Sequence, residues 1–306
     1  MPRLLITGAS GLLGANLVLA AHDEHDVIAV YYRHPIELEG VQSVSADLCQ
    51  PGRAKELLDR FQPDWVIHCA ANTSIDELEG DPERAFRTNR DMAANVAEAA
   101  HGIGAKLVHI STDAVFDGRS GSYREDDPTE PVNVYGESKL AGEQAVQAAC
   151  PEALIIRTNI FGWNAQPKSS LAEWFIHNLI QGIPCKGFTD VYFNPLLVNH
   201  LWAIIDSLNN SDLWGVFHVG SDPCISKYEF GVRLAESFDL NQELISAVEI
   251  ETGSLRASRP KNTCLDCSKI REVIDVELLG LESNIGFFHE LEQLGYVEEL
   301  RKMAVQ

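Results

Sequence analysis

The sequence predicts an α/β fold, a doubly wound parallel sheet with a small C-terminal lobe. The first half of the chain alternates strand-like and helix-like segments, and its strands are near-continuous apolar runs, as expected when helices cover both faces of a sheet. The first strand, residues 3–7, ends at glycines and leads directly into a helix. Beyond about residue 160 this rhythm is lost. We therefore expect a sheet domain at residues 1–160 and a lobe at residues 161–306.

Each element is assigned from its apolar run, its helix formers and the breaks that bound it. Strands are expected at residues 3–7, 27–32, 65–70, 106–111 and 153–158, and helices at 12–21, 53–61, 84–100 and 135–149. In the lobe, helices are expected at 171–182, 228–238 and 285–303, the last with a Gly-Tyr interruption. Residues 210–222 are expected to return one strand to the sheet. We expect the lobe to cover the carboxyl ends of the strands, where such sheets bind ligands.

Composition excludes several classes of protein. With 306 residues and 45% apolar side chains, the chain can bury a large core, so disorder is not expected. Its formal net charge of −21 would repel a polyphosphate backbone, so nucleic acid is not an expected partner. Apolar stretches are too short to cross a membrane, and the start lacks a basic leader followed by an apolar core. These features favour a cytoplasmic protein without a membrane partner.

The cysteines do not suggest metal or disulfide chemistry. Seven of them, an odd number, are scattered along the chain, which argues against a disulfide framework. Cys264 and Cys267 have CxxC spacing, yet no second such pair exists, and one pair cannot supply four zinc ligands. A chance spacing is the simpler interpretation. We expect no metal site.

Three glycines follow the first strand and open the first helix. Glycine there permits a tight turn and lets the backbone approach a pyrophosphate, whose charge the helix N-terminus stabilises. The GxxGxxG spacing differs from the GxGxxG dinucleotide fingerprint, and alone it is a weak signal. Its position between a strand and a helix at the very start of the chain strengthens it. The predicted dinucleotide contacts in this turn are Gly8, Ser10, Gly11, Leu12, Leu13 and Gly14.

The residues after the next strands bear on the choice of dinucleotide. An acidic residue there accepts a hydrogen bond from the ribose 2′-hydroxyl of NAD, whereas Arg accommodates the 2′-phosphate of NADP. Residues 27–34 contain no carboxylate, and Arg33 stands near the strand end where a 2′-phosphate would lie, which favours NADP over NAD. The alternative is an exposed arginine at a strand end. Further contacts are expected from Asp47 and Leu48 near the adenine, and from Cys69, Ala70 and Ala71, whose small side chains follow the third strand.

Tyr135 and Lys139 lie four residues apart at the start of a predicted helix, which places them on one helix face. A nearby ammonium favours phenolate, so we expect Lys139 to lower the pKa of Tyr135 from its usual value near ~10. Such a tyrosine can exchange protons at neutral pH. Taken singly, Tyr135 could be a packing residue and Lys139 a solvated charge. Together with the glycine turn, the pair indicates an oxidoreductase.

The motifs resemble those of the extended short-chain dehydrogenase/reductase family, in which GxxGxxG is the usual glycine turn. The resemblance is greatest to its dTDP-4-dehydrorhamnose reductase branch, and it implies a Rossmann fold that binds NAD(P). It runs through essentially the whole chain. The segments that carry it are His68–Asp76, His109–Gly118 (HISTDAVFDG), Tyr135–Glu143, Arg157–Thr158, Arg259–Pro260 and Leu265–Asp266.

The resemblance implies roles for individual residues. Thr112 would hold a substrate carbonyl oxygen, Tyr135 would donate the proton, and Lys139 would bind the ribose and acidify Tyr135. Asn89 would support Lys139 through a water, although it could equally be a satisfied interior amide. A hydroxyl donor beside an acidified phenol suits the negative charge that develops on a carbonyl oxygen during hydride addition. The resemblance also places Ser74, Asp76, Thr112 and Asn159 on the substrate side.

Departures from the family pattern bear on the substrate. Related dehydratases follow the threonine with Asp-Glu, but here Ala114 follows Asp113, which favours a simple reductase. The tryptophan expected after Arg-Thr-Ser is absent or displaced to Trp163. Phe193 and Asn194 lie in a divergent segment and are candidate substrate contacts, with a packed loop as the alternative.

Arg259 is the best candidate ligand for a substrate diphosphate, because a guanidinium can pair two phosphate oxygens. Arg256 could substitute for it, and a surface salt bridge is the competing explanation.

We therefore expect an NADPH-dependent reductase of a 4-keto-6-deoxy sugar nucleotide. One alternative is an epimerase or a reductase of another keto-sugar. An alternative of another class is an NADP-binding regulatory subunit, because the methionine adenosyltransferase β subunit shares the resemblance and fold does not settle function. The expected partner is a small nucleotide-sugar, and the resemblance implies a homodimer through helices flanking the sheet.

Overall fold

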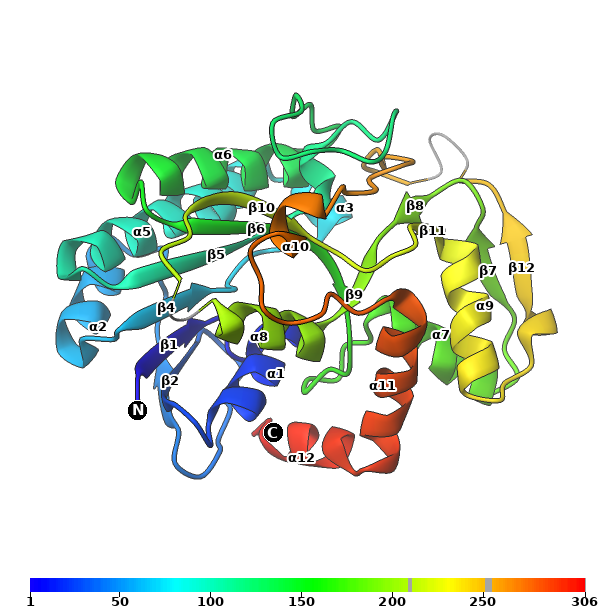
Figure 1. Ribbon diagram of the computed structural model, residues 1–306, viewed down its shortest axis with the longest axis horizontal. Helices are drawn as coiled ribbons and strands as arrows, with labels where there is room; N and C mark the ends of the chain where they lie inside the picture. Colours follow the sequence, from blue (N-terminus) through cyan, green and yellow to red (C-terminus); the bar gives the residue numbers. More distant parts are fainter. Residues whose placement is uncertain (209–210, 251–254, 306) are drawn as a thin grey trace.

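The computed structural model describes residues 1–208, 211–250 and 255–305 and confirms the doubly wound parallel sheet. The strand order is β10-β6-β5-β4-β1-β2-β3, with β9 paired to β6 (Figure 1). The bounds are β1 (Arg3–Thr7), β2 (Asp26–Tyr31), β3 (Gln42–Ser45), β4 (Trp65–His68), β5 (Lys106–Thr112), β6 (Leu154–Phe161), β9 (Pro195–Leu197) and β10 (Gly215–Val219). The order reverses at β1, so β1 and β4 flank the point where a crevice opens beyond the strand ends.

Alternate residues of each strand face two separate apolar layers. Leu4 and Ile6 of β1 pack with α1 (Leu12–Ala21) and α8 (Val198–Ser207) on one face. Leu5, between them, packs with α2 (Arg53–Phe61), α5 (Met92–Ile103) and α6 (Val134–Ala149) on the other. Figure 1 shows these helices on opposite sides of the sheet. Both faces are therefore covered, which explains why the strands have no polar alternation.

The single helix expected at residues 84–100 is interrupted. The structure has α4 (Pro82–Phe86), a π-turn (Arg87–Asp91) and then α5. Asp81 caps α4 by accepting a hydrogen bond from the backbone N–H of Arg84 at 3.0 Å. A π-turn inserts one extra residue into a helix and often occurs at functional sites. Here it contains Asn89, whose poor helix propensity was the only sequence sign of the irregularity.

The lobe contains α7 (Leu171–Ile180), α9 (Lys227–Ser237) and α11 (Leu281–Gln293), seen at the right and lower right of Figure 1. Ser170 and Ser226 begin α7 and α9 with capping boxes, in which the serine and a glutamate three residues later satisfy each other's backbone N–H groups. Two small sheets complete it: β7 (Cys185–Phe188) with β12 (Ile245–Val248), and β8 (Tyr192–Phe193) with β11 (Ile225–Ser226).

The remaining short helices are α3 (Ile75–Leu78), α10 (Ser268–Arg271) and α12 (Tyr296–Lys302), with 3-10 turns at Asp113–Val115 and Gln242–Leu244. α11 and α12 are separated at Gly295, in agreement with the expected interruption. After α12 the chain returns to the loop that follows β2. There Ala304 pairs with Ile36, and Glu37 donates its N–H to the Met303 carbonyl at 2.8 Å.

The structure bears on the strand expected within residues 210–222 and on the cysteines. The strand expected within residues 210–222 corresponds to β10, which pairs with β6; residue 210 lies outside the described residues. The division of the chain at residue 160 stays a prediction. Among the residues described, no helix has the length and apolarity needed to cross a membrane.

The expectation that the cysteines form no disulfide framework was wrong in one respect, because Cys224 and Cys264 form a disulfide with their Cα atoms 5.8 Å apart. These residues are 40 positions apart, so only the folded chain brings them together.

Candidate active site

The glycine turn is held by close backbone packing. Gly8 has a φ of +66°, and a Cβ on it would lie 2.8 Å from backbone atoms of Ala70. A Cβ on Gly14 would lie 2.2 Å from the carbonyl oxygen of Gly8. Gly11 is the N-cap of α1 and offers no side-chain cap to the first helical N–H groups. The turn therefore presents the N-terminus of α1 toward the carboxyl edge of the sheet, as anion binding requires.

A cavity of about 590 Å³, here called the glycine-turn pocket, opens beside this turn. It brings together most of the predicted dinucleotide contacts, namely Gly8, Ser10, Gly11, Arg33, Asp47, Leu48, Cys69, Ala70 and Ala71. Leu12, Leu13 and Gly14 are absent from its described lining and belong to α1. Ser74, expected on the substrate side, lines this pocket instead.

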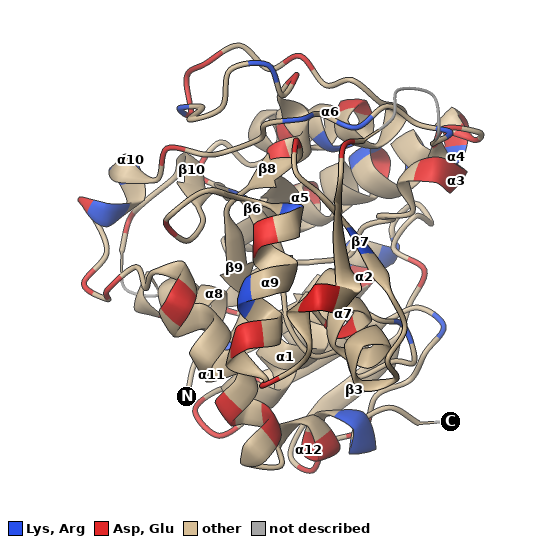
Figure 2. Ribbon diagram, turned by 90° about the vertical axis from the view of Figure 1, so that its right-hand side faces the viewer, with Lys and Arg blue, Asp and Glu red and all other residues tan. Residues whose placement is uncertain are grey.

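The glycine-turn pocket is rich in basic groups. Arg33 lines the pocket, and the central carbon of the Arg33 guanidinium is 4.9 Å from the ring centroid of Tyr32. Arg84, Arg87 and Lys168 also line it, and sequence analysis missed all three. Asp47 is the only carboxylate in the described lining, and it accepts a hydrogen bond from the Cys49 N–H at 3.1 Å. This local excess of basic groups contrasts with the formal net charge of −21 of the whole chain. Figure 2 shows acidic positions spread over the helices, including α9, where basic positions also occur.

Tyr135 lies in the first turn of α6, which Asn133 caps by accepting the Gly136 N–H at 2.9 Å. The phenol is buried and makes a side-chain hydrogen bond with Thr112, the last residue of β5. Burial raises the pKa of Tyr135 to about 12, and the bond to Thr112 only partly opposes this. The phenol is therefore protonated at neutral pH.

The pKa of Tyr135 is raised, whereas the spacing of Tyr135 and Lys139 led us to expect it to be lowered. Lys139 is 3% exposed, and its ammonium donates to the Ile110 carbonyl at 2.7 Å. Burial lowers the pKa of Lys139 to about 8, against the opposing charge of Glu143. Helical spacing predicted that both side chains lie on one face of the helix, but it could not show how strongly burial would raise the pKa of the phenol.

Asn89 is an interior amide with all its groups engaged. Its Oδ1 accepts the Asn72 N–H at 2.8 Å, and its Nδ2 donates to the Asn72 carbonyl and to Ser138 Oγ, both at 3.0 Å. Ser138 lies on α6 between Tyr135 and Lys139. Asn89 thus connects the π-turn, the loop after β4 and the helix that contains the tyrosine. The structure shows no direct contact between Asn89 and Lys139 among the described residues.

A buried carboxylate, Asp113, gathers the second half of the site, here called the Asp113 cluster: Thr112, Asp113, Asn159, Lys227 and Thr263. Asp113 accepts hydrogen bonds from Thr112 at 3.0 Å, Asn159 at 2.9 Å and Thr263 at 2.6 Å. Burial raises the pKa of Asp113, and the charge of Lys227 partly opposes this. Sequence analysis named Thr112 and Asn159 but missed Thr263 and Lys227, which carry no local motif.

Arg259 and Asp76, both expected on the substrate side, form an ion pair with 2.7 Å between Nη2 and Oδ2. Asp76 also accepts the Ala257 N–H at 3.0 Å, and these contacts lower its pKa. Arg259 lines a second cavity, the lobe pocket, of about 640 Å³, together with Arg119 and Lys261. Arg256 packs against Gly80 and is not in that lining. Arg259 therefore has a salt bridge and still faces a cavity.

The divergent aromatic segment lies in the interior. Phe193 is 3% exposed and packs edge-on against Phe230. Asn194 donates to the Ser221 carbonyl at 2.8 Å and accepts the Leu265 N–H at 2.7 Å, so both ends of its amide are engaged. Trp163 stacks on Phe288 and donates to its carbonyl at 3.0 Å. The structure thus favours the packed-loop alternative for Phe193 and Asn194, and it places Trp163 in the core.

A buried ion pair supports the floor of the site. Arg157 on β6 contacts Glu143 on α6, with 2.7 Å between Nη2 and Oε2, and Ser111 donates to the same carboxylate. Beside it, Thr7 hydrogen-bonds His68 at 2.7 Å, and His68 stacks on His109. Burial lowers the pKa of His68 to about 3. A polar layer therefore lies between the sheet and α6, directly beneath Tyr135 and Lys139.

Two groups of side chains among the described residues could hold a metal ion: His101 with Cys150 and Glu152, and Glu24 with His25 and Asp206. Neither includes a residue of the pockets or of the Asp113 cluster. The CxxC pair forms no such group, since Cys264 is in the disulfide and Cys267 is a buried free thiol.

Comparison with known proteins agrees with this geometry. The chain is 31% identical over 286 residues to the probable low-salt glycan biosynthesis reductase Agl14 of Haloferax volcanii, covering 92% of this chain and 95% of that protein. It is 31% identical over 290 residues to the methionine adenosyltransferase 2 subunit β of Danio rerio, covering 91% and 85%. Among solved structures, dTDP-4-dehydrorhamnose reductase from Bacillus anthracis in complex with NADP is 27% identical, with a TM-score of 0.83 and coverage of 94% and 99%.

The family model for the RmlD substrate binding domain matches residues 2–288, nearly the whole chain. This match includes the glycine turn, the Tyr135 helix and the Asp113 cluster. The chain therefore belongs to the RmlD substrate binding domain family.

Proposed function

We propose that this chain is an NADPH-dependent reductase of a 4-keto-6-deoxy sugar nucleotide. The observation that carries the proposal is the hydrogen bond between the buried phenol of Tyr135 and Thr112 at the carboxyl end of β5. β4 lies between β5 and β1, so this pair stands close to the glycine-turn pocket. Two hydroxyl groups thus converge beside a pocket suited to a dinucleotide.

The glycine-turn pocket fits NADPH in its donor chemistry. The uncapped N-terminus of α1 would receive the pyrophosphate. Arg33, with Arg84 and Arg87, supplies cations for a 2′-phosphate, which favours NADPH over NADH. NADPH, when bound, supplies the hydride that reduces the carbonyl. The Bacillus anthracis relative, solved with NADP, supports this assignment.

Thr112 and Tyr135 would orient the substrate ketone and meet the negative charge that develops on its oxygen. A phenol with a pKa of about 12 is protonated at neutral pH, so Tyr135 can act as a proton donor in the reductive direction. Lys139, held against the Ile110 carbonyl, places a positive charge one helical turn from the phenol. Asn89 would position this helix through Ser138.

The substrate side would recognise a nucleotide-linked sugar. Arg259, Arg119 and Lys261 around the lobe pocket would bind a diphosphate by exchanging their present carboxylate partners for phosphate oxygens. The Asp113 cluster includes Thr112 and would border the sugar. A cytoplasmic location and a homodimer through helices flanking the sheet are the finer parts of this proposal, and sedimentation of the purified protein tests the second.

The test is oxidation of NADPH and of NADH with dTDP-4-keto-6-deoxy sugar, followed by nicotinamide absorbance, with the product identified by NMR. We expect a 4-hydroxy product, a preference for NADPH, and a Tyr135→Phe variant that binds NADPH but loses about 10²–10⁴-fold in turnover. Tyr296→Phe, which removes a part-buried hydroxyl that donates to Asn16 on α1, is the control. An active Tyr135→Phe variant would refute the proposed role of Tyr135. Interconversion of sugars without net NADPH consumption would support an epimerase instead.

A second candidate function is that of an NADP-binding regulatory subunit. The chain is as similar to the methionine adenosyltransferase β subunit of Danio rerio as to the Haloferax reductase, at 31% identity each. Co-purification with a methionine adenosyltransferase catalytic subunit, combined with no turnover of any keto-sugar, would favour this candidate. Turnover that depends on Tyr135 would favour the reductase.

A further inference from the structure

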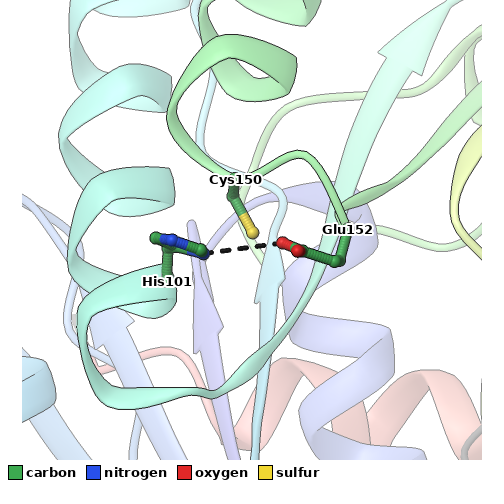
Figure 3. A group of neighbouring side chains, drawn as sticks. All are labelled: His101, Cys150 and Glu152. Carbon is green, nitrogen blue, oxygen red and sulfur yellow. Dashed lines mark ion pairs between the residues drawn. The ribbon is translucent and has the colours of Figure 1, made fainter.

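Three side chains of types that bind metals lie close together at the C-terminal ends of α5 and α6, at the other end of α6 from Tyr135. His101 lies in the last turn of α5, Cys150 is the C-cap of α6, and Glu152 lies in the turn that leads into β6. One donor atom from each lies within 4.8 Å of the others, and 3.5 Å separate His101 Nδ1 from Glu152 Oε2. Figure 3 shows the three side chains pointing toward one another. The arrangement joins elements about fifty residues apart in sequence.

Backbone hydrogen bonds hold the chain in place at these positions. The Cys150 N–H donates to the Val146 carbonyl at 2.8 Å, and the Ala153 N–H donates to the Cys150 carbonyl at 3.0 Å, which closes a tight turn around Glu152. At the end of α5, the Gly104 N–H donates to the His101 carbonyl at 3.1 Å. The three Cα atoms are therefore fixed by packed helices and a turn, and only side-chain rotation is needed to adjust the donors.

The donor set matches a particular class of metal. Imidazole nitrogen, thiolate sulfur and carboxylate oxygen are all zinc ligands, and bond lengths of about 2.0–2.3 Å put tetrahedral donors roughly 3.3–3.6 Å apart. The observed separation of 3.5 Å between nitrogen and oxygen lies in that range. Magnesium and calcium prefer oxygen donors alone. The exposed side chains of His101 and Glu152, 55% and 71% accessible, leave room for a water as fourth ligand.

Helix electrostatics favours a cation at the same place. His101 and Cys150 lie at the C-terminal ends of α5 and α6, so two helix dipoles direct their negative ends toward the group. A cysteine binds zinc as the thiolate, so zinc binding at this group would release the thiol proton.

The other group is a weaker candidate. Glu24, His25 and Asp206 offer no sulfur, and His25 Nε2 already bonds Asp206 at 3.0 Å. His25 therefore serves as an internal control.

We propose that His101, Cys150 and Glu152 bind one zinc ion with water as the fourth ligand. The ion would join the C-terminal end of α5 to that of α6, the helix that contains Tyr135 and Lys139. This inference does not depend on the proposed function.

The experiment is a titration of the purified full chain with zinc alone, against a colorimetric chelator, with cobalt as a spectroscopic substitute. Cys150→Ser, His101→Gln and Glu152→Gln are compared with three controls: His25→Gln, Cys185→Ser, which removes another buried free thiol, and Cys49→Ser. Thermal unfolding is recorded with and without zinc, because a ligand that binds the folded state raises the Tm.

We expect one zinc per wild-type chain, a zinc-dependent rise in Tm, and a thiolate-to-cobalt charge-transfer band. Cys150→Ser should abolish the band, and each of the three ligand variants should weaken zinc binding by at least about 10–100-fold, with the controls unaffected. His101→Gln and Glu152→Gln alter exposed side chains, so their loss of binding cannot be ascribed to unfolding. Retention of zinc by Cys150→Ser, its loss in His25→Gln, or the absence of a cobalt–thiolate band would overturn the proposal.

Discussion

The glycine-turn pocket and the Asp113 cluster lie at the same edge of the sheet but are built differently. The first depends on a seven-residue segment, Gly8 to Gly14, and on close backbone packing. A Cβ placed on Gly14 would lie only 2.2 Å from the carbonyl oxygen of Gly8. The second depends on side chains from Asp113, Asn159, Lys227 and Thr263, and the bond between Asp113 and Thr263 spans 150 residues. A site made from local backbone geometry can be recognised in a sequence. A site made from distant side chains becomes visible only in the folded chain.

The largest expected effect comes from the buried ion pair between Glu143 and Arg157, which lies between the sheet and α6. Glu143→Gln leaves Arg157 buried with its charge unmatched, and removal of one partner of a buried pair costs about 3–5 kcal/mol. Urea unfolding measures this loss. Glu56→Gln is the matched control, because its pair with Arg53 is exposed and is worth about 0–1 kcal/mol. Equal losses in the two variants would show that the buried pair stabilises the fold no more than the exposed one.

Gly14→Ala tests whether the glycine-turn pocket depends on backbone contact. The new Cβ would force the turn to shift, and overpacking typically costs about 1–3 kcal/mol, or roughly 5–150-fold in NADPH affinity if the strain falls on the bound turn. Fluorescence titration with NADPH measures it. Gly102→Ala in α5, where no atom lies within 4 Å of the new Cβ, should bind NADPH normally. Normal binding by Gly14→Ala would contradict the backbone account.

Acid should weaken the region around the Asp113 cluster through His218. Burial and the charge of Arg157 lower the pKa of His218 to about 4 from its usual value of about 6.5, so the unfolded chain takes up a proton that the folded chain resists. Stability then falls as pH drops below about 6.5, by about 2 kcal/mol between pH 7 and pH 5. His218→Gln should reduce this pH dependence by that amount in urea unfolding, whereas exposed His34→Gln serves as control. An unchanged pH dependence would exclude His218 as its source.

The smallest effects should separate the glycine-turn pocket from the lobe pocket, the proposed diphosphate end of the substrate side, by ligand. Arg33→Ala should raise the KM for NADPH about tenfold and leave that for the nucleotide sugar unchanged, because Arg33 lines only the glycine-turn pocket. Arg259→Ala should do the reverse, since Arg259 lines the lobe pocket. Steady-state kinetics with each ligand varied in turn provides both values. A shift of both KM values in either variant would mean that the two pockets act as one.

The sheet domain was largely predictable because its signals are local. β1, α1 and α2 begin and end at the predicted residues, since glycines and polar breaks bound each apolar run. The π-turn was missed because its residues are ordinary in a helix apart from Asn89. In the lobe, α8 and the short strands were missed. β8 and β11 are two residues each, and their pairing depends on contacts across more than thirty residues.

The same distinction applies to the site. The dinucleotide contacts came from turns and strand ends, and most of them line one pocket. Phe193 and Asn194 were selected because their segment departs from the family pattern, which cannot distinguish a ligand contact from a packed interior. The predicted shift in the pKa of Tyr135 was wrong in direction, because the spacing shows that a charge is nearby but not how much burial raises the pKa.

The contact between the C-terminus and the loop after β2 has a consequence for protein engineering. Val305 donates its N–H to the Pro35 carbonyl at 3.2 Å, only two residues from Arg33. A tail exchanged with that of a relative would therefore alter the loop that contains Arg33 without any substitution in the glycine-turn pocket. Under the proposed function, exchange of this segment would change the surroundings of Arg33, and a bulky group attached after Val305 would disturb the same loop.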